Sequence, residues 1–328
     1  MPDSPLAQFR LPYPSNIPSR AVYYGVGAML TVHNFSYGLV TPVLGYLMSC
    51  LGAFLGLRCT SRARATTGRE RLRWLLLAAL SIGTTGIWVM HFIAMLGYTV
   101  PGQIIHYNVP ITILSMVIAV VVVGIGLLIV GFGKPGWRTL IPAGIFTGLG
   151  VAAMHYTGMA AVRLSGRMTF SPSLFTLSVV IAIVAATAAL WAGLNLSGLG
   201  ATLGASLIMG VAVSGMHYTG MAALHMWPES RAGGMNMTGG GATAESFLLP
   251  LVIGISILAF IMTATIALSP SGDEMREDAD LMRRIEAIQA GSPPLAPMPP
   301  PAAQPRAVRV VSRGTQARRH AARTDRRS

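Results

Sequence analysis

The sequence predicts an all-α, polytopic membrane protein with seven transmembrane helices, arranged as three helical-hairpin repeats followed by a closing helix. The first observation is the composition: of 328 residues, 52% are hydrophobic and only 11% are charged, whereas soluble domains carry about 25% charged residues. The second is a series of apolar runs, each close to the ~20 residues that a helix needs to cross a bilayer. The third is a short motif that recurs at nearly equal spacing, which is typical of one structural unit used several times.

The apolar runs set the expected helix boundaries. In chain order, the expected spans are 38–57, 74–95, 111–132, 140–161, 174–194, 201–224 and 247–268. The first six spans pair into three hairpins, and the second helix of each hairpin ends in a copy of the motif. We expect residues 1–32 to be a flexible lead-in, 33–268 to be the membrane domain, and 269–328 to be a disordered, basic cytoplasmic tail.

The basic residues predict the orientation in the membrane. The formal net charge is +13, and a dense group of arginines follows the first span: Arg58, Arg62, Arg64, Arg69, Arg71 and Arg73. Cytoplasmic loops carry an excess of Lys and Arg. We therefore expect a bacterial inner-membrane protein with its amino terminus outside and its carboxyl terminus in the cytoplasm. The charge reports topology in the lipid bilayer, so we expect no nucleic-acid partner.

The repeated motif reads Met-His-aromatic, with a second Met five residues after the first. Its copies occupy residues 90–95, 154–159 and 216–221, and the spacing between successive histidines is 64 and then 62 residues. Each copy lies near the outer end of its span. Three separate segments therefore bring an imidazole to the same depth, and polar groups inside a membrane usually mark functional sites because they are costly to place there.

The donor atoms of the motif suggest a metal. Each motif histidine shares a helix face with the methionine four residues later, and imidazole with thioether suits copper, especially Cu(I). His33 lies at the same outer level and could add a fourth imidazole. The candidate ligands are His91, His155, His217, Met95, Met159, Met221, Met90, Met154, Met216 and His33. Tyr156 and Tyr218 could hydrogen-bond an imidazole. Packing alone would also explain a Met or His on an apolar helix.

Other functions stay open from the residues alone. Copper delivery or transport would use the same donors, but would require further donors deeper in the membrane. Haem binding would use two histidines on facing helices as axial ligands. A scaffold protein would use the histidines only for packing. The expected spans contain no lysine for a retinal Schiff base and no acid for a proton-driven transporter. The sequence shows no nucleophile–base pair, so we do not expect an enzyme.

The two Met-His-Tyr-Thr copies, the Met-His-Phe variant and the repeated hairpins resemble the MHYT-domain membrane proteins of bacteria, over about residues 33–268. The resemblance implies a membrane-bound sensor whose Met and His residues bind copper and, through it, sense oxygen, carbon monoxide or nitric oxide. Many members carry a cyclic-di-GMP or kinase domain after the membrane part. The resemblance therefore implies a separate cytoplasmic signalling partner for this chain. The first copy departs from the pattern, because Phe92-Ile93 replaces Tyr-Thr there.

Overall fold

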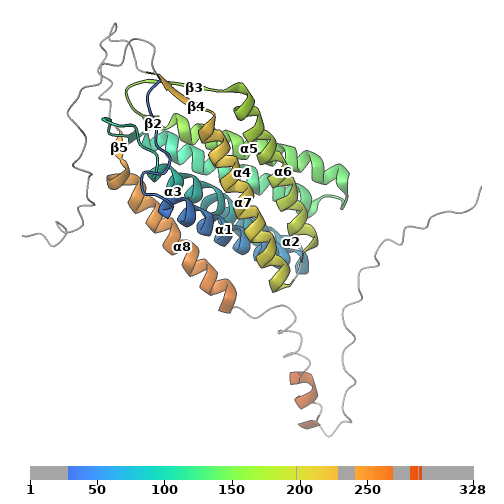
Figure 1. Ribbon diagram of the computed structural model, residues 1–328. Coiled ribbons are helices and arrows are strands. Elements are labelled where there is room, and N and C mark those ends of the chain that lie inside the picture. Colours follow the sequence, from blue (N-terminus) through green and yellow to red (C-terminus); the bar gives the residue numbers. More distant parts are fainter. Residues whose placement is uncertain (1–28, 197, 228–240, 269–280, 287, 290–328) are drawn as a thin grey trace, which may run out of the picture. The chain divides into compact units, whose positions relative to one another are not determined.

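The computed structural model describes residues 29–196, 198–227, 241–268, 281–286 and 288–289. The expected lead-in, apart from its last four residues, and most of the expected tail lie outside these ranges. The chain divides into two units, Met1–Ser269 and Pro270–Ser328. In the second unit, residues 281–286 are helical. The first unit is a helical bundle (Figure 1).

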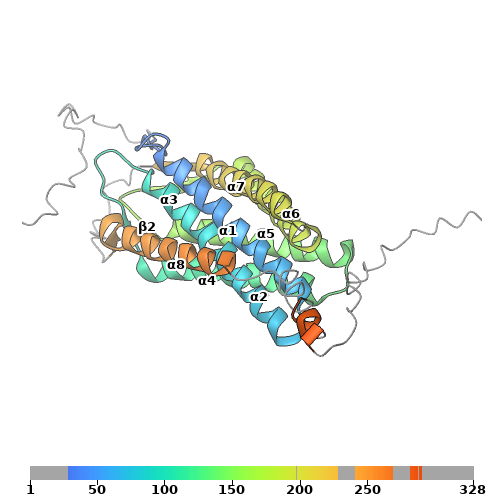
Figure 2. The same cartoon turned by 90° about the horizontal axis from the view of Figure 1, so that it is seen from below.

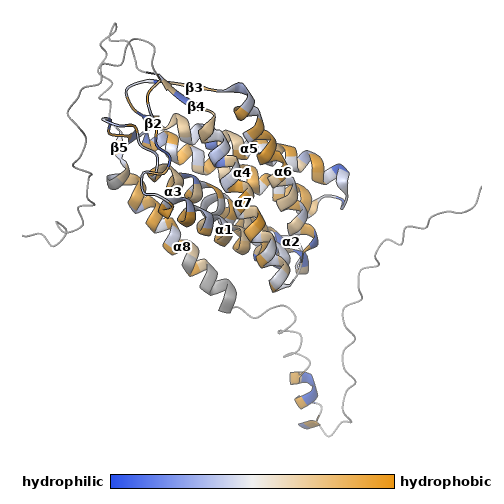
Figure 3. Ribbon diagram, in the orientation of Figure 1, coloured by the Kyte–Doolittle hydropathy of each residue, from blue (hydrophilic) through white to orange (hydrophobic). Residues whose placement is uncertain are grey.

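The bundle confirms the all-helical membrane fold. Within the described residues, six helices are long and apolar enough to cross a membrane, and Figure 3 shows the apolar residues along them. The spans are α1 (Val40–Ala65); the continuous run of α2 (Gly68–Leu80), η2 (Ser81–Val89) and α3 (Met90–Leu96); and α4 (Val109–Phe132), α5 (Trp137–Ala160), α6 (Pro172–Asn195) and α7 (Leu199–Ala222). A short π-helical turn, η3 (Ala244–Leu248), leads into α8 (Leu249–Leu268), which takes the place of the predicted closing helix.

The first helix is longer than predicted. It continues to Ala65, eight residues beyond the expected end at Leu57, so the first arginines after the span lie on the helix and not in a loop. Arginine is a good helix former and can extend its charged group away from an apolar surface. In this helix, the Arg64 guanidinium donates hydrogen bonds to the carbonyl oxygens of Leu194 and Leu196 at the end of α6. These bonds satisfy carbonyl groups that a helix end leaves without partners.

The six spans pack as a closed ring. Each neighbouring pair is in contact in the order α1, α2–η2–α3, α4, α5, α6, α7 and back to α1, while α8 packs on the outside against η2 and α1 (Figures 1 and 2). The three hairpins are thus successive around the ring. Because the motif always lies on the second helix of a hairpin, the motif-bearing spans alternate with spans that lack it. This alternation places the three motifs around a common axis.

The second span contains an unusual segment directly before its motif. Residues Ser81–Val89 form a π-helix between α2 and α3. Its Gly86 meets Gly52 of α1 so closely that a Cβ on Gly52 would clash with the backbone nitrogen of Gly86. The first helix and this segment therefore pack backbone against backbone at these glycines. Since a π-turn changes the helical rotation of the residues after it, this segment helps to set the direction in which His91 points.

Short strands join the loops beyond the motif-bearing helix ends. The strand β1 (His106–Tyr107) lies between β2 (Val162–Arg163) and β5 (Ala242–Thr243), and β3 (Arg167–Phe170) pairs with β4 (Leu224–Trp227), all antiparallel. These strands were not predicted from the sequence. Runs of two to four residues are too short to show the alternation that identifies a strand.

Candidate metal centre

The three motif histidines occupy equivalent positions on their helices. Each lies five residues before the last residue of its helix, which is Leu96, Ala160 or Ala222. At 1.5 Å per residue, each is about 7.5 Å from that helix end. Because the three motif-bearing helices surround a common axis, residues at equal depth on them lie close together. The ligand atoms of His91, His155 and His217 lie within 4.8 Å of one another. We call these three residues the His triad.

The Nδ1 atoms of the triad face one another. The Nδ1 of His91 is 3.1 Å from the Nδ1 of His217 and 3.1 Å from the Nδ1 of His155. The rings are nearly perpendicular in every pair, with centroids 4.9, 5.0 and 5.2 Å apart. Each histidine is only 1% exposed. Two nitrogens bound to one metal at about 2.0 Å are about 3.3 Å apart at a tetrahedral angle, so the observed separations are close to those of a shared ion.

Hydrogen bonds alone cannot satisfy this arrangement. A neutral imidazole carries one N–H, so its Nδ1 either donates or accepts. The His91 Nδ1 faces two Nδ1 atoms at once and cannot make a good bond to both. A cation placed between the three nitrogens would accept a lone pair from each. Three imidazole nitrogens that face one another are a donor set of the kind that transition-metal ions prefer.

The other ring nitrogens are turned away from the centre. The Nε2 atoms of His91 and His155 are buried and have no hydrogen-bond partner among the described residues. They face glycines of the next motif along the chain: a Cβ on Gly158 would lie 2.6 Å from the His91 Nε2, and a Cβ on Gly220 would lie 2.5 Å from the His155 Nε2. The glycine of the Met-His-Tyr-Thr-Gly-Met copies thus makes room for the imidazole of the preceding copy. The glycine is visible in the sequence motif, but its role could not be inferred there because it depends on which helices are neighbours.

The aromatic residue of each motif packs edge-on against its own histidine. The ring centroids are 4.7 Å apart for Phe92 and His91, 4.8 Å for Tyr156 and His155, and 4.9 Å for Tyr218 and His217. These contacts need no hydroxyl group, which explains why the first copy can carry phenylalanine.

The expected hydrogen bond from tyrosine to imidazole is wrong for Tyr156. Its hydroxyl pairs with the Ser178 hydroxyl at 2.6 Å, because the tyrosine side chain reaches across to α6. The Tyr218 hydroxyl is buried without a partner in the part of the chain that the structure describes.

The six motif methionines are all buried, at 1–3% exposure. The leading residues Met90 and Met216 turn toward other features. The Met90 side chain contacts the position of Gly45 on α1, and Met216 lines an apolar cavity. Met154 lies in the large apolar core together with Met95, Met159 and Met221, the residues four positions after the triad histidines. By helix geometry these last three share a face with the triad.

His33 is not brought to the triad. It is exposed, and its backbone pairs with Thr99 through two hydrogen bonds of 2.9 and 2.8 Å. The pairing holds the chain before α1 against the loop after α3, so His33 lies outside the cluster of potential ligands found among the described residues. His33 was expected to be a fourth imidazole because it lies at the same predicted depth as the motif histidines. Equal depth does not bring residues of different segments together.

Two segments of the chain match the family model described as "Bacterial signalling protein N terminal repeat", MHYT, over residues 85–143 and 148–205. Each matched segment begins just before a motif, and together they include His91 and His155 of the triad. The chain belongs to the MHYT family. The third copy, with His217, lies beyond both matched segments, and it completes the triad with the same local sequence. No solved structure matches the chain significantly.

Curated relatives of this MHYT protein are signalling proteins. It is 33% identical over 74% of its length to MucR of Pseudomonas aeruginosa, a bifunctional diguanylate cyclase/cyclic di-GMP phosphodiesterase. It is 39% identical over 59% of its length to NbdA of the same organism, a cyclic di-GMP phosphodiesterase. It is 29% identical over 81% of its length to an uncharacterized signaling protein of Caulobacter vibrioides. The chain spans 35%, 25% and 31% of these relatives, respectively.

Proposed function

We propose that this protein is a membrane sensor in which the His triad binds one metal ion, copper, and a diatomic gas such as O₂, CO or NO is the signal. The observation that supports it most directly is the convergence of three buried Nδ1 atoms on one point. Copper is favoured because the other nearby donors are thioethers: Met95, Met159 and Met221 share a helix face with the triad and offer a fourth ligand. The one carboxylate on the described spans is Glu70, in the first turn of α2 and 21 residues before His91, so no carboxylate lies near the triad to suit a hard cation.

The geometry also explains how a signal would leave the site. The three histidines belong to three different hairpins, so one ion ties all the hairpins together at the same depth. A gas bound at copper, or a change of its redox state, would alter which ligands stay bound. The hairpins would then shift against each other, and their opposite ends, including the arginine-rich end of the first hairpin, would move with them.

The main alternatives fit the site less well. A haem between two of the histidines would require a flat slot, whereas the three rings pack edge to face in mutual contact. Copper transport would require donors along a path through the bundle. The cavity beneath the triad is lined mostly by aliphatic side chains, which do not bind copper.

Copper content and Cu(I) affinity, measured on protein purified in mild detergent, test the proposal. The site variant is His91→Ala/His155→Ala/His217→Ala, and the matched control is His33→Ala/His106→Ala/His225→Ala, which removes the same number of histidines outside the triad. We expect near-stoichiometric copper in wild type and control and its loss in the site variant. Size-exclusion and thermal unfolding check that all three proteins fold. Wild-type protein that stays metal-free after Cu(I) loading, or equal copper in both variants, would refute the metal site.

The orientation and the output are part of the same proposal. We place the triad near the outer face of the bacterial inner membrane and the arginine-rich helix ends in the cytoplasm. The relatives' names connect cyclic-di-GMP enzymes with sequences like this one, so we propose that the bundle acts on a cytoplasmic partner of that class. Cysteine-labelling from each side of the membrane, at exposed Arg69 and at exposed Ile104, tests the orientation. Labelling of the Ile104→Cys variant only from the cytoplasm would contradict it.

A further inference from the structure

An apolar cavity lies inside the ring of spans. Its volume is ≈ 60 Å³, and α1, η2, α4, α5, α6 and α7 all contribute to its wall. This volume is the space open to the centre of a water-sized molecule, and about 10–15 Å³ of it is enough to hold one such molecule. The cavity therefore has room for more than one molecule of that size, and interiors of proteins rarely keep such space.

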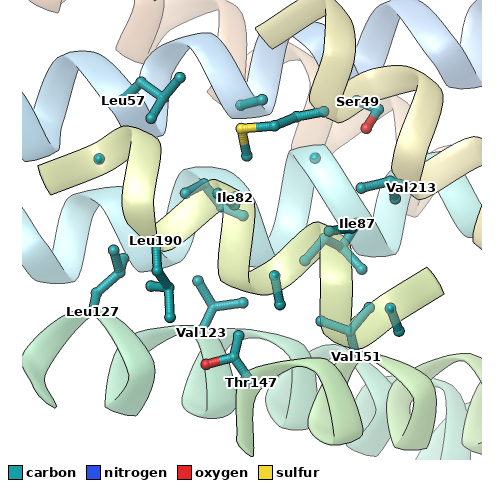
Figure 4. Close-up of a pocket in the computed structure, with 18 of the residues that line it drawn as sticks. Ser49, Leu57, Ile82, Ile87, Val123, Leu127, Thr147, Val151, Leu190 and Val213 are labelled. Atoms are coloured by element: carbon teal, nitrogen blue, oxygen red, sulfur yellow. The ribbon is translucent and has the colours of Figure 1, made fainter. Parts of the chain in front are cut away.

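One end of the cavity lies directly beneath the His triad. Three of its lining residues, Ile87, Val151 and Val213, each precede a triad histidine by four positions, and residues four apart lie one above the other on a helix. Figure 4 shows these three side chains gathered at one end, with Leu57, Leu127 and Leu190 at the other. Met216, which precedes His217 in the third motif, is also part of the wall. The cavity thus begins one helical turn below the imidazoles.

The chemistry of the wall favours an apolar occupant. Three hydroxyl groups interrupt the aliphatic lining, and the one on Thr60 is already bonded to the Leu57 carbonyl at 2.9 Å. The hydroxyls of Ser49 and Thr147 have no partner among the described residues, but they come from α1 and α5 and lie on opposite sides in Figure 4. An ordered water requires two to four polar partners, and apolar cavities stay dry or take up small apolar molecules such as xenon.

We propose that this cavity binds a small uncharged molecule of low polarity, a diatomic gas, and supplies it to the inner side of the His triad. Such a molecule prefers hydrocarbon to water, so the bilayer core around the bundle is its natural source. The second half of this proposal, supply to a metal, rests on the proposed function. The first half does not, because the cavity belongs to the metal-free chain.

Xenon binding to the metal-free protein tests the first half. Ala186 on α6 lines the cavity and is buried, whereas Ala188 on the same helix is exposed. Leucine at 186 would fill the cavity, while leucine at 188 would project outward. We expect the chemical shift of dissolved ¹²⁹Xe to change when the wild-type protein or the Ala188→Leu variant is added. Adding the Ala186→Leu variant should not produce this change. Absence of a xenon-dependent shift in wild type, or an equal shift in both variants, would overturn the cavity as a gas site.

A second pair protects the test against a folding defect at position 186. Val213 lines the cavity and Val211 on the same helix is 62% exposed, so Val213→Phe and Val211→Phe form a matched pair with the same expectation.

CO binding to the Cu(I)-loaded protein, followed after flash photolysis, tests the supply. CO should rebind more slowly in the cavity-filling variants Ala186→Leu and Val213→Phe than in the matched controls Ala188→Leu and Val211→Phe. Equal CO rates would overturn the supply to the metal. A wild type that holds no copper would refute the proposed function, while the xenon result still decides the cavity.

Discussion

Replacing Gly158 or Gly220 with alanine should disrupt the His triad, although neither glycine is itself a ligand. A Cβ at these positions would lie 2.6 Å from the His91 Nε2 and 2.5 Å from the His155 Nε2, and ordinary contact begins at 3.4 Å. The imidazole would have to move by about 0.8 Å for His91 and about 0.9 Å for His155 in a close-packed interior. Metal–ligand distances are held within about 0.2 Å, so the displaced Nδ1 would no longer reach the shared position.

The size of the effect depends on this displacement. Inserting a methyl group into a packed core costs about 1–3 kcal/mol of stability, and disturbing the support of a metal-bound histidine lowers metal affinity about 10–100-fold. We therefore expect a lower Cu(I) affinity of this order for Gly158→Ala and for Gly220→Ala, together with a lower unfolding temperature of the metal-free protein.

The assay is competition for Cu(I) with a chromophoric chelator, combined with thermal unfolding in detergent. Gly204→Ala is the control, because Gly204 lies on α7 as Gly220 does and a Cβ there would meet nothing within 4 Å. It should match wild type in both measurements. Wild-type affinity and stability in Gly158→Ala and Gly220→Ala would show that the imidazoles are not held as described, and would refute ligation through Nδ1.

Two further predictions concern other parts of the bundle. Arg64→Ala should lower the free energy of unfolding by about 1–3 kcal/mol, because it removes the donor to the Leu194 and Leu196 carbonyls; denaturant titration should show no comparable loss for exposed Arg69→Ala. Burial raises the pKa of Tyr98 to about 12. Its contribution to stability is therefore complete below pH 10, the pKa of the unfolded tyrosine, and is lost as the pH rises toward 12. Tyr98→Phe should weaken that alkaline decline and, since the Tyr98 hydroxyl is buried without a described partner, should not destabilise the protein at pH 7; an unchanged alkaline profile would contradict this.

Helical periodicity and hydropathy were sufficient for the architecture of the bundle. Both are local properties, and a run of about 20 apolar residues has few options other than a membrane helix. The boundaries were less certain where arginines follow the first span: α1 runs on to Ala65 because arginine supports a helix as well as a loop. The short strands beyond the motif-bearing helix ends, with only two to four residues each, gave no readable pattern.

The sequence by itself determined the three motifs, their equal depth and the types of donor atom that they present. These depend only on the spacing of residues along each helix. It also identified the family, since the motif and its repetition are properties of the chain. Packing was not needed for any of these conclusions.

Only the tertiary structure decided which of these groups meet. The ring order brings the histidines of alternate spans to one axis, turns Nδ1 inward, places Gly158 against His91, and leaves His33 exposed. It also creates the apolar cavity one turn below the triad. The physical reason is that distances between helices depend on how side chains of different spans interlock. A one-dimensional pattern fixes the depth of a residue in the membrane, but not its neighbours on other helices.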